Sequence, residues 1–217
     1  MKYKLIIFDM DGVLVDSEPA ISTASKEALS EWCVEASIED FKEFTGMGDD
    51  RFIGGVAAKY GVEYDIAMKA RAYEIYLSTA KERVGVYPWS KSVISEMHEK
   101  GYMLAVASAS DKVKVECNIE CIGVDKSLFR TIVTGSDVKN KKPAPDIFLC
   151  AAEKAGFLPE ESVVVEDALS GVMAAKAAKM TAVAVTTSFT YEALKNAGAD
   201  YIVSTLDELA GIVSENA

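Results

Sequence analysis

The sequence has few of the residues from which zinc centres are built. Its 217 residues include one histidine, His98, and four scattered cysteines with no Cys-x-x-Cys pair. Zinc sites take such ligands in groups of three or four at close spacing, so a zinc centre is not expected. The cysteines are instead expected to be reduced and to pack in the core.

Long apolar runs and excess positive charge are also missing. No run reaches the roughly 20 residues needed to span a bilayer, and two aspartates interrupt the short apolar segment near the N-terminus, which argues against a signal peptide. A cytoplasmic location is therefore expected, with no membrane partner. The formal net charge of −11 disfavours nucleic acid, whose binding depends on cationic contacts to phosphate. Nothing in the sequence requires stable association, so a monomer or a weak homo-oligomer is expected.

Short apolar runs alternate with helical segments along most of the chain. The runs cover residues 5–8, 102–108, 131–135, 162–167, 181–185 and 201–205. Strands that alternate with helices predict a doubly wound α/β fold, in which a parallel sheet is covered on both faces. Because the connections between parallel strands are right-handed, the carboxyl ends of these strands are expected to meet at one edge.

Residues 17–84 interrupt the alternation with helical segments and no convincing strand. We therefore expect an α/β core formed by residues 1–16 and 85–217, with an inserted helical domain at 17–84. The linkers are expected near residues 15–18 and 83–88. An insertion of this length is far longer than an ordinary connection between a strand and a helix, which is typical of a functional role.

Polar residues suited to phosphoryl transfer follow the predicted strands. They are Asp9 and Asp11 after the first, Ser108 and Ser110 at the second, Lys139, Lys141 and Lys142 beyond the third, and Glu166 and Asp167 at the fourth. Four carboxylates beside a lysine call for a divalent cation, and an all-oxygen ligand set suits Mg²⁺. An aspartate can accept a phosphoryl group covalently, and the transferred group needs cations and hydroxyl donors around it.

Four segments have the order and spacing of a known family. DMDGVLVDSEP, VASAS, KKPAPDIF and VVVEDALSGVMAAKAA resemble the motifs of the haloacid dehalogenase superfamily, in its branch of helical-cap phosphatases and β-phosphoglucomutase-like proteins. The resemblance covers nearly the whole chain. It implies a Mg²⁺-dependent phosphatase that acts on a small phosphorylated metabolite, such as a sugar phosphate, through an aspartyl-phosphate.

The same resemblance implies a role for each motif residue. Asp9 is similar to the nucleophile that becomes phosphorylated, and Asp11 to the general acid and base. Ser108 resembles the residue that hydrogen-bonds the phosphoryl group, with Ala109 beside it. Lys142 resembles the residue that neutralises the nucleophile and the phosphate.

The resemblance also implies a metal site and a substrate-selecting cap. The metal would be held by Asp9, the main-chain carbonyl of Asp11 and Asp167, with Glu166 binding directly or through water. Glu166 and Asp167 could instead cap the following helix, since acids are favoured at helix N-termini. In the expected cap, Glu18 is a candidate for contact with the leaving group, and Arg51 for contact with a phosphate or sugar. Arg51 follows a loop that contains Gly46 and Gly48.

Departures from the family pattern separate the alternatives. The superfamily's dehalogenases lack the second aspartate, so the presence of Asp11 disfavours dehalogenation. β-Phosphoglucomutase carries a cap histidine where this chain has Ile21, which weakens the reading as a phosphosugar mutase. A receiver domain would carry its phosphorylated aspartate on a middle strand and would have no large helical insertion. A catalytically silent binding protein would not need all the expected groups.

Overall fold

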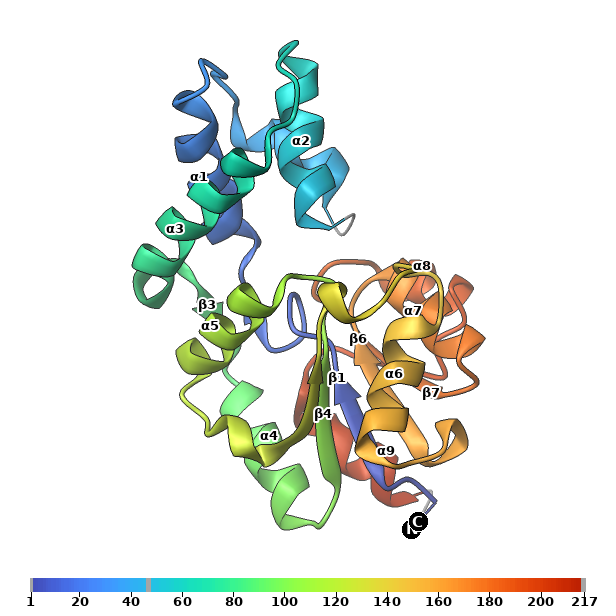
Figure 1. The fold of residues 1–217 in the computed structure, drawn as a ribbon. Helices are drawn as coiled ribbons and strands as arrows, with labels where there is room; N and C mark the ends of the chain where they lie inside the picture. Colours follow the sequence, from blue (N-terminus) through green and yellow to red (C-terminus); the bar gives the residue numbers. More distant parts are fainter. Residues whose placement is uncertain (1, 46–47, 216–217) are drawn as a thin grey trace.

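The structure, a computed structural model, describes residues 2–45 and 48–215 and contains a six-stranded parallel sheet (Figure 1). The strand order is β5-β4-β1-β6-β7-β8. The strands are β1 (Leu5–Phe8), β4 (Met103–Ala107), β5 (Phe129–Val133), β6 (Ser162–Glu166), β7 (Thr181–Val185) and β8 (Tyr201–Val203). The first strand is central, because Phe8 is in register with Val106 of β4 on one side and Val165 of β6 on the other. The predicted doubly wound α/β fold is confirmed.

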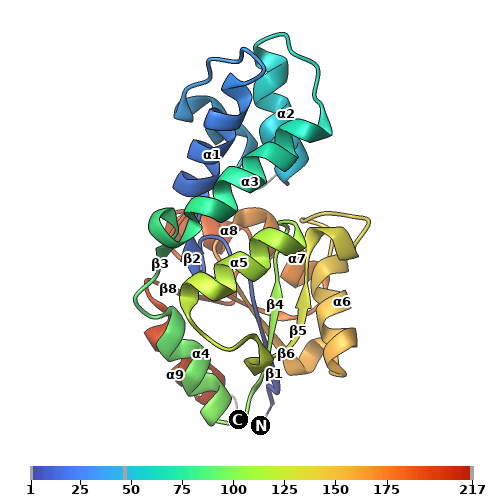
Figure 2. The ribbon, with the colours of Figure 1, turned by 60° about the vertical axis from the view of Figure 1, so that its left-hand side comes forward.

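Helices cover both faces of the sheet (Figure 2). One face packs against α4 (Ser90–Glu99), α5 (Lys112–Ile122) and α9 (Leu209–Glu215), and the other against α6 (Asp146–Ala155), α7 (Leu169–Ala177) and α8 (Tyr191–Asn196). Successive residues of β1 point to opposite faces, so Ile6 and Phe8 enter the first core and Leu5 and Ile7 the second. This two-sided burial explains why β1 is a continuous apolar run.

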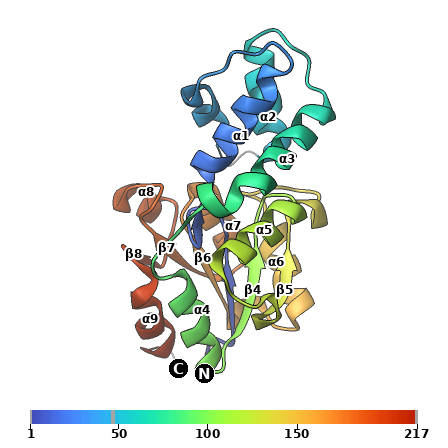
Figure 3. The ribbon, with the colours of Figure 1, turned by 90° about the vertical axis from the view of Figure 1, so that its left-hand side faces the viewer.

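A separate group of helices stands beyond the carboxyl-terminal edge of the sheet, at the opposite end from both chain termini (Figures 1 and 3). This helical unit consists of α1 (Glu18–Ser30), the 3₁₀ helix η1 (Ile38–Phe44), α2 (Asp49–Lys59) and α3 (Ile66–Arg83). It encloses its own apolar cluster, in which Leu29, Phe41, Ile53 and Tyr76 are fully buried. The unit can therefore keep its own packing while it is joined to the core by two short segments.

These two segments pair with each other. Strands β2 (Val15–Asp16) and β3 (Gly85–Val86) form an antiparallel ladder, with Val15 opposite Val86 and Asp16 opposite Gly85. The sequence predicts linkers here but not strands. Two-residue strands are too short to show the alternation of apolar and polar residues from which strands are predicted.

Two smaller expectations differ from the structure. Strand β5 begins at Phe129, two residues earlier than expected, because the buried Phe129 ring joins the core. Cys33 is exposed, which contradicts a core position for all four cysteines; the other three are partly buried. Among residues 2–45 and 48–215, no helix is both long and apolar enough to cross a bilayer.

Candidate active site

Asp9 follows β1 directly and lies at the carboxyl edge of the sheet, almost fully buried. Its main-chain N–H donates to the Val165 carbonyl at 2.9 Å, which continues the pairing of β1 with β6. The Lys142 ammonium lies 2.5 Å from Asp9 Oδ1 and 2.6 Å from Glu166 Oε1. One buried cation therefore joins carboxylates from two neighbouring strands, as expected from their positions at strand ends.

The acids around Lys142 repel one another in a buried site. Burial raises the pKa of Asp9 to about 7; Lys142 opposes this shift, and the charges of Glu166 and Asp11 add to it. Burial and the neighbouring carboxylates of Glu166 and Asp9 likewise raise the pKa of Asp167 well above its usual range. Burial alone would lower the pKa of Lys142, but Asp9 and Glu166 outweigh it and the pKa rises. The lysine stays charged, and Asp9 and Asp167 hold their protons to a higher pH than ordinary carboxyl groups do.

Glu166 has hydrogen-bond partners on both of its carboxylate oxygens. Oε1 accepts from Lys142, and Oε2 accepts from the N–H groups of Asp167 and Ala168, each at 2.9 Å. Gly171 leaves the room that the carboxylate occupies, since a Cβ there would lie 1.8 Å from Glu166 Oε1. Glu166 thus fixes Lys142 and the chain just before α7, but it does not cap that helix, which has no side-chain cap hydrogen bond at its N-cap residue Ala168.

Asp167 packs against the loop that follows β1. Gly12 has a φ of +81°, and a Cβ there would lie 2.0 Å from Asp167 Oδ2. The Ser188 hydroxyl donates to the same Asp167 oxygen, and the Thr187 hydroxyl donates to the Gly12 carbonyl at 2.5 Å. The loop after β7 therefore fixes both Asp167 and the segment between Asp11 and β2.

We expect Gly12→Ala to lower activity at least tenfold. The methyl group would displace the Asp167 carboxylate, and the left-handed backbone at this position would cost about 1 kcal/mol in any residue with a Cβ. Steady-state kinetics and thermal unfolding of the variant measure the two effects. Gly61→Ala is the matched control, because Gly61 has a similar φ of +75° with no atom within 4 Å of its would-be Cβ. Equal activity losses in both variants would contradict the role given to Gly12.

Asp11 has a different set of partners from Asp9. Its carboxylate accepts from the hydroxyl groups of Ser17 and Ser110, from the Lys114 ammonium and from the Asn118 amide. Burial by itself would raise the pKa of Asp11. The charge of Lys114 and the hydrogen bonds from Ser17 and Ser110 outweigh burial and hold this pKa below its usual range. Ser17, Lys114 and Asn118 were missed from the sequence. Lys114 and Asn118 are four residues apart, a spacing that could have placed both on one helical face.

Ser108 and Ala109 continue β4 at the same edge of the sheet. The Ser108 N–H donates to the Val133 carbonyl at 3.0 Å, and its buried hydroxyl oxygen accepts from the Ser110 N–H at 3.2 Å. The Ala109 carbonyl packs against Gly135, where a Cβ would lie 2.2 Å away. The structure thus brings this segment beside β1, as expected, and holds its backbone closely.

The two candidates in the helical unit are not joined to these groups. Glu18 begins α1 and accepts a hydrogen bond from the Thr45 hydroxyl at 2.9 Å. Arg51 is exposed on α2 and lines a surface pocket of about 450 Å³ formed by residues of the helical unit alone. No hydrogen bond or ion pair within the described ranges links either residue to Asp9, Lys142 or their neighbours. Gly46 lies outside the described residues.

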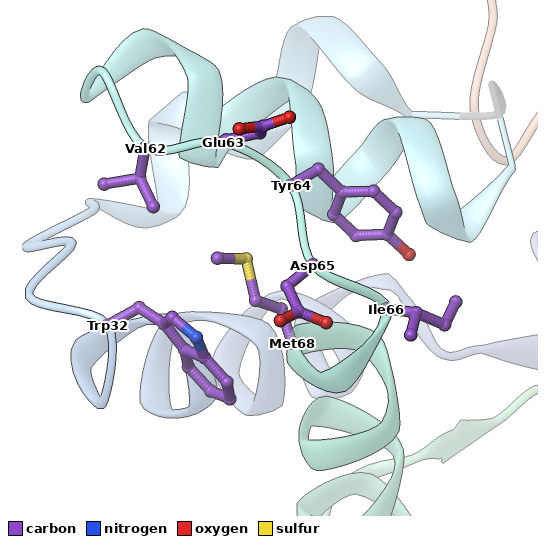
Figure 4. Close-up of a pocket in the computed structure, with 7 residues that line it drawn as sticks. All are labelled: Trp32, Val62, Glu63, Tyr64, Asp65, Ile66 and Met68. Atoms are coloured by element: carbon purple, nitrogen blue, oxygen red, sulfur yellow. The ribbon is translucent and has the colours of Figure 1, made fainter.

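A second surface pocket, of about 410 Å³, also belongs to the helical unit (Figure 4). It is lined by Trp32, Val62, Glu63, Tyr64, Asp65, Ile66 and Met68. It contains two acids and no lysine or arginine, and Asp65 caps α3 through the Ala67 N–H at 2.9 Å. Such a lining does not suit an anionic substrate, so the sheet edge around Asp9 is the better candidate site.

The groups at the sheet edge fit a divalent cation. Burial and the charges of neighbouring carboxylates raise the pKa values of Asp9 and Asp167, and a bound cation would favour the ionised form of both. Oxygen ligands suit a hard cation. Within the described ranges, no group of three or more His, Cys, Asp or Glu side chains is arranged to hold a metal ion by itself. Main-chain oxygen or water would therefore complete the coordination.

The chain belongs to the haloacid dehalogenase-like hydrolase family, whose model matches residues 6–185. It is 42% identical over 205 residues to Protein SUPPRESSOR OF QUENCHING 1, chloroplastic, of Arabidopsis thaliana; the match covers 93% of this chain but only 19% of that protein. It is 32% identical over 185 residues to the fructose-1-phosphate phosphatase YqaB of Escherichia coli, covering 85% of this chain and 97% of that one. The structure of CbbY from Rhodobacter sphaeroides in complex with phosphate is similar, with a TM-score of 0.82 and 26% identity over 95% of this chain and 96% of that one.

Proposed function

We propose that this protein is a Mg²⁺-dependent phosphatase that hydrolyses a small phosphomonoester, such as a sugar phosphate, through phosphorylated Asp9. The observation that carries the proposal is the buried Lys142 ammonium within 2.6 Å of Asp9 and Glu166 at the end of the central strands. This arrangement supplies a carboxylate nucleophile beside a fixed cation, which phosphoryl transfer requires. The likeness to YqaB, which is named a fructose-1-phosphate phosphatase, supports the same reaction class.

The first half of the proposed reaction transfers the phosphoryl group to Asp9. A carboxylate oxygen of Asp9 bonds to phosphorus while the bond from phosphorus to the leaving oxygen breaks. Asp11 donates its proton to that oxygen, which leaves as an alcohol. Lys142 holds Asp9 Oδ1 at 2.5 Å and thereby orients the nucleophile, and Ser108 would donate a hydrogen bond to the phosphoryl oxygens.

The second half returns the enzyme to its starting state. Asp11, now a carboxylate, takes a proton from water as the water oxygen bonds to phosphorus. The bond between phosphorus and Asp9 breaks, which releases inorganic phosphate and restores the Asp9 carboxylate. Asp11 ends the cycle protonated, ready for the next substrate. Its donors hold the pKa of Asp11 below the usual range in the free protein, so the proposal requires that Asp11 takes up this proton as the anionic substrate binds, since nearby negative charge raises the pKa of a carboxyl group.

Mg²⁺ is the cation we propose for this site. Asp9, the main-chain carbonyl of Asp11 and Asp167 would hold it, and its charge would offset that of the phosphoryl oxygens. Because both oxygens of Glu166 have protein donors, as described above, we assign Glu166 to holding Lys142, with at most a water-mediated contact to the metal. Ser188, which donates to Asp167, would orient that ligand.

The boundary between the helical unit and the core carries charges of both signs. Asp49 and Asp50 of α2 lie there with Asp111, and Lys69 of α3 pairs with Asp50 at 2.8 Å and with Asp111 at 3.0 Å. The Asp111 N–H also donates to Asp49 at 3.4 Å. A phosphosugar mutase must hold a bisphosphate when it returns the phosphoryl group to a phosphorylated sugar. Lys141 and Lys114 also act on Asp50 and Asp49, so the charge of this boundary does not decide between the two reactions. Hydrolysis is favoured over the mutase alternative because Ile21, where the resemblance places the cap histidine of the mutase, is an apolar side chain buried in the helical unit.

The decisive experiment measures phosphate release from a panel of sugar phosphates, other small phosphomonoesters and sugar bisphosphates. We expect Mg²⁺-dependent release that EDTA abolishes. Isomerisation of a sugar phosphate without phosphate release would establish the mutase instead. If neither release nor isomerisation is found with folded protein, the proposed function is wrong.

Mg²⁺ is expected to raise the thermal midpoint, with a larger rise at higher pH. Asp9 has a pKa of about 7 in the fold against about 4 in an unfolded chain, so the metal-free fold loses stability as the pH rises across this interval. A bound cation displaces the proton and removes this loss. Thermal unfolding at pH 5 and pH 8, with Mg²⁺ or EDTA, should therefore show a shift of a few degrees at pH 8 and a smaller one at pH 5. A shift that does not change with pH would contradict metal binding by Asp9 and Asp167.

The location and association of the protein also remain proposals. We propose a cytoplasmic enzyme that binds a small phosphorylated metabolite and no nucleic acid, as a monomer or weak homo-oligomer. The name of the Arabidopsis relative places that protein in the chloroplast. We further propose that the helical unit is a cap that closes over the site, with residues 1–16 and 85–217 as the core and 17–84 as the cap.

A further inference from the structure

The partners of Asp11 extend into the helical unit. Tyr76 of α3 is fully buried, and its hydroxyl donates to Asn118 Oδ1 of α5 at 2.5 Å. The Asn118 amide nitrogen donates in turn to Asp11 Oδ1 at 3.3 Å. Helices α3 and α5 pack against each other (Figure 2). A chain of two hydrogen bonds therefore connects the helical unit to a carboxylate of the core.

Tyr76 determines which end of the Asn118 amide faces Asp11. Burial and the nearby Asp11 charge raise the pKa of the Tyr76 hydroxyl, so it stays protonated and donates to the carbonyl oxygen of the Asn118 amide. With Oδ1 occupied in this way, the amide nitrogen points to Asp11. Without the phenol, the buried amide could turn its oxygen toward the carboxylate, which would remove the donor and add repulsion.

Lys114 supplies the buried positive charge of the same group. Its ammonium lies 3.3 Å from both Asp11 oxygens and 3.1 Å from Ser110 Oγ. It also lies 6.0 Å from the centre of the Tyr76 ring. The Lys114 side chain is 5% exposed, whereas that of Asp11 is 32% exposed. The donors are therefore enclosed, while the carboxylate that they hold keeps an accessible side.

We propose that Tyr76, Asn118 and Lys114 form a positioning relay through which α3 sets the direction of the Asp11 carboxylate. The inference rests on the proposed function, in which Asp11 gives a proton to the leaving oxygen. Because Tyr76 and Asn118 belong to different packed units, a displacement of α3 against α5 breaks their hydrogen bond. The position of the helical unit thereby controls whether Asp11 is aligned for proton transfer.

The test compares two substrates that differ in their need for an acid. A sugar phosphate releases an alkoxide that must be protonated, whereas p-nitrophenyl phosphate releases a stable nitrophenolate. kcat/KM reports the step up to loss of the leaving group. We expect Lys114→Met to lower kcat/KM for the sugar phosphate about 100-fold and Tyr76→Phe about tenfold, with roughly twofold changes or less for p-nitrophenyl phosphate.

The control is Tyr60→Phe, which also removes one hydrogen bond from a tyrosine to a carboxylate in the helical unit, at 3.0 Å from Asp40. Tyr60→Phe is expected to leave kcat/KM unchanged for both substrates. Equal losses for both substrates in the relay variants, or no loss for either, would overturn the relay. If Lys114→Met fails to fold, Tyr76→Phe decides, because it removes a single oxygen atom. If wild-type protein hydrolyses neither substrate, the proposed function fails instead.

Thermal unfolding tests the relay without a measurement of enzyme activity. No hydrogen bond in the described ranges joins Tyr76 to Asp11 directly; Asn118 and Ser17 lie between them. The relay predicts that Tyr76→Phe combined with Asp11→Asn lowers the thermal midpoint by less than the sum of the two single changes, because either change already breaks the chain. Strictly additive changes would show that the two side chains are independent.

Discussion

Asp9→Asn is expected to lower kcat at least a thousandfold, which corresponds to about 4 kcal/mol of lost transition-state stabilisation. The amide is nearly isosteric with the carboxylate but cannot form the phosphoenzyme. The fold should be retained, and at pH 8 without metal the variant should unfold no earlier than the wild type, because it no longer has to bury the Asp9 carboxylate, whose burial raises its pKa. Phosphate release and thermal unfolding measure the two outcomes.

The matched control for this change is Asp207→Asn, since Asp207 is exposed in the 3₁₀ helix Leu206–Glu208, beyond the last strand. It should leave turnover unchanged. Hydroxylamine converts an aspartyl phosphate to an aspartyl hydroxamate. This product should form at Asp9 in wild-type protein during turnover and should be missing in Asp9→Asn. Turnover near the wild-type rate in Asp9→Asn would remove Asp9 from the role of nucleophile.

Lys142→Met is expected to damage both activity and stability. The lysine is the shared cation of Asp9 and Glu166, and its removal leaves two buried carboxylates without their partner. Breaking such a pair costs about 3 kcal/mol or more, so the thermal midpoint should fall by roughly 6 °C or more. Activity should fall by at least two orders of magnitude, because the nucleophile loses both its orientation and its neutralising charge.

Lys141→Met tests whether this effect is specific to one lysine of the pair. The Lys141 ammonium donates to the Gly135 main-chain carbonyl and forms no ion pair in the described part of the chain. Its loss should cost less than tenfold in activity and about 1 kcal/mol in stability, as for a single hydrogen bond. Similar effects of the two substitutions would mean that Lys142 acts only through the general positive charge of this segment.

The sequence alone determined the fold and the place of the candidate site. The continuous apolar runs of β1 and β6 are typical of strands that are buried on both faces of a parallel sheet. The carboxyl ends of such strands lie at one edge of the sheet. Asp9, Ser108, Glu166 and Asp167 therefore gather there although they are far apart in the chain. Lys142 lies well beyond β5, and only its motif context pointed to the same place, where the structure puts it within 2.5 Å of Asp9.

Only the tertiary structure decided how these groups are paired. In the structure, Glu166 accepts hydrogen bonds from Lys142 and from the main chain before α7, and Ser188 donates to Asp167. Asp11 is surrounded by donors from the linker and α5. It also paired the two linkers as β2 and β3. Contacts of this kind depend on the direction of each side chain and on how separate elements pack. A periodic pattern records which face of an element is buried, but it does not record which atom on another element will meet that face.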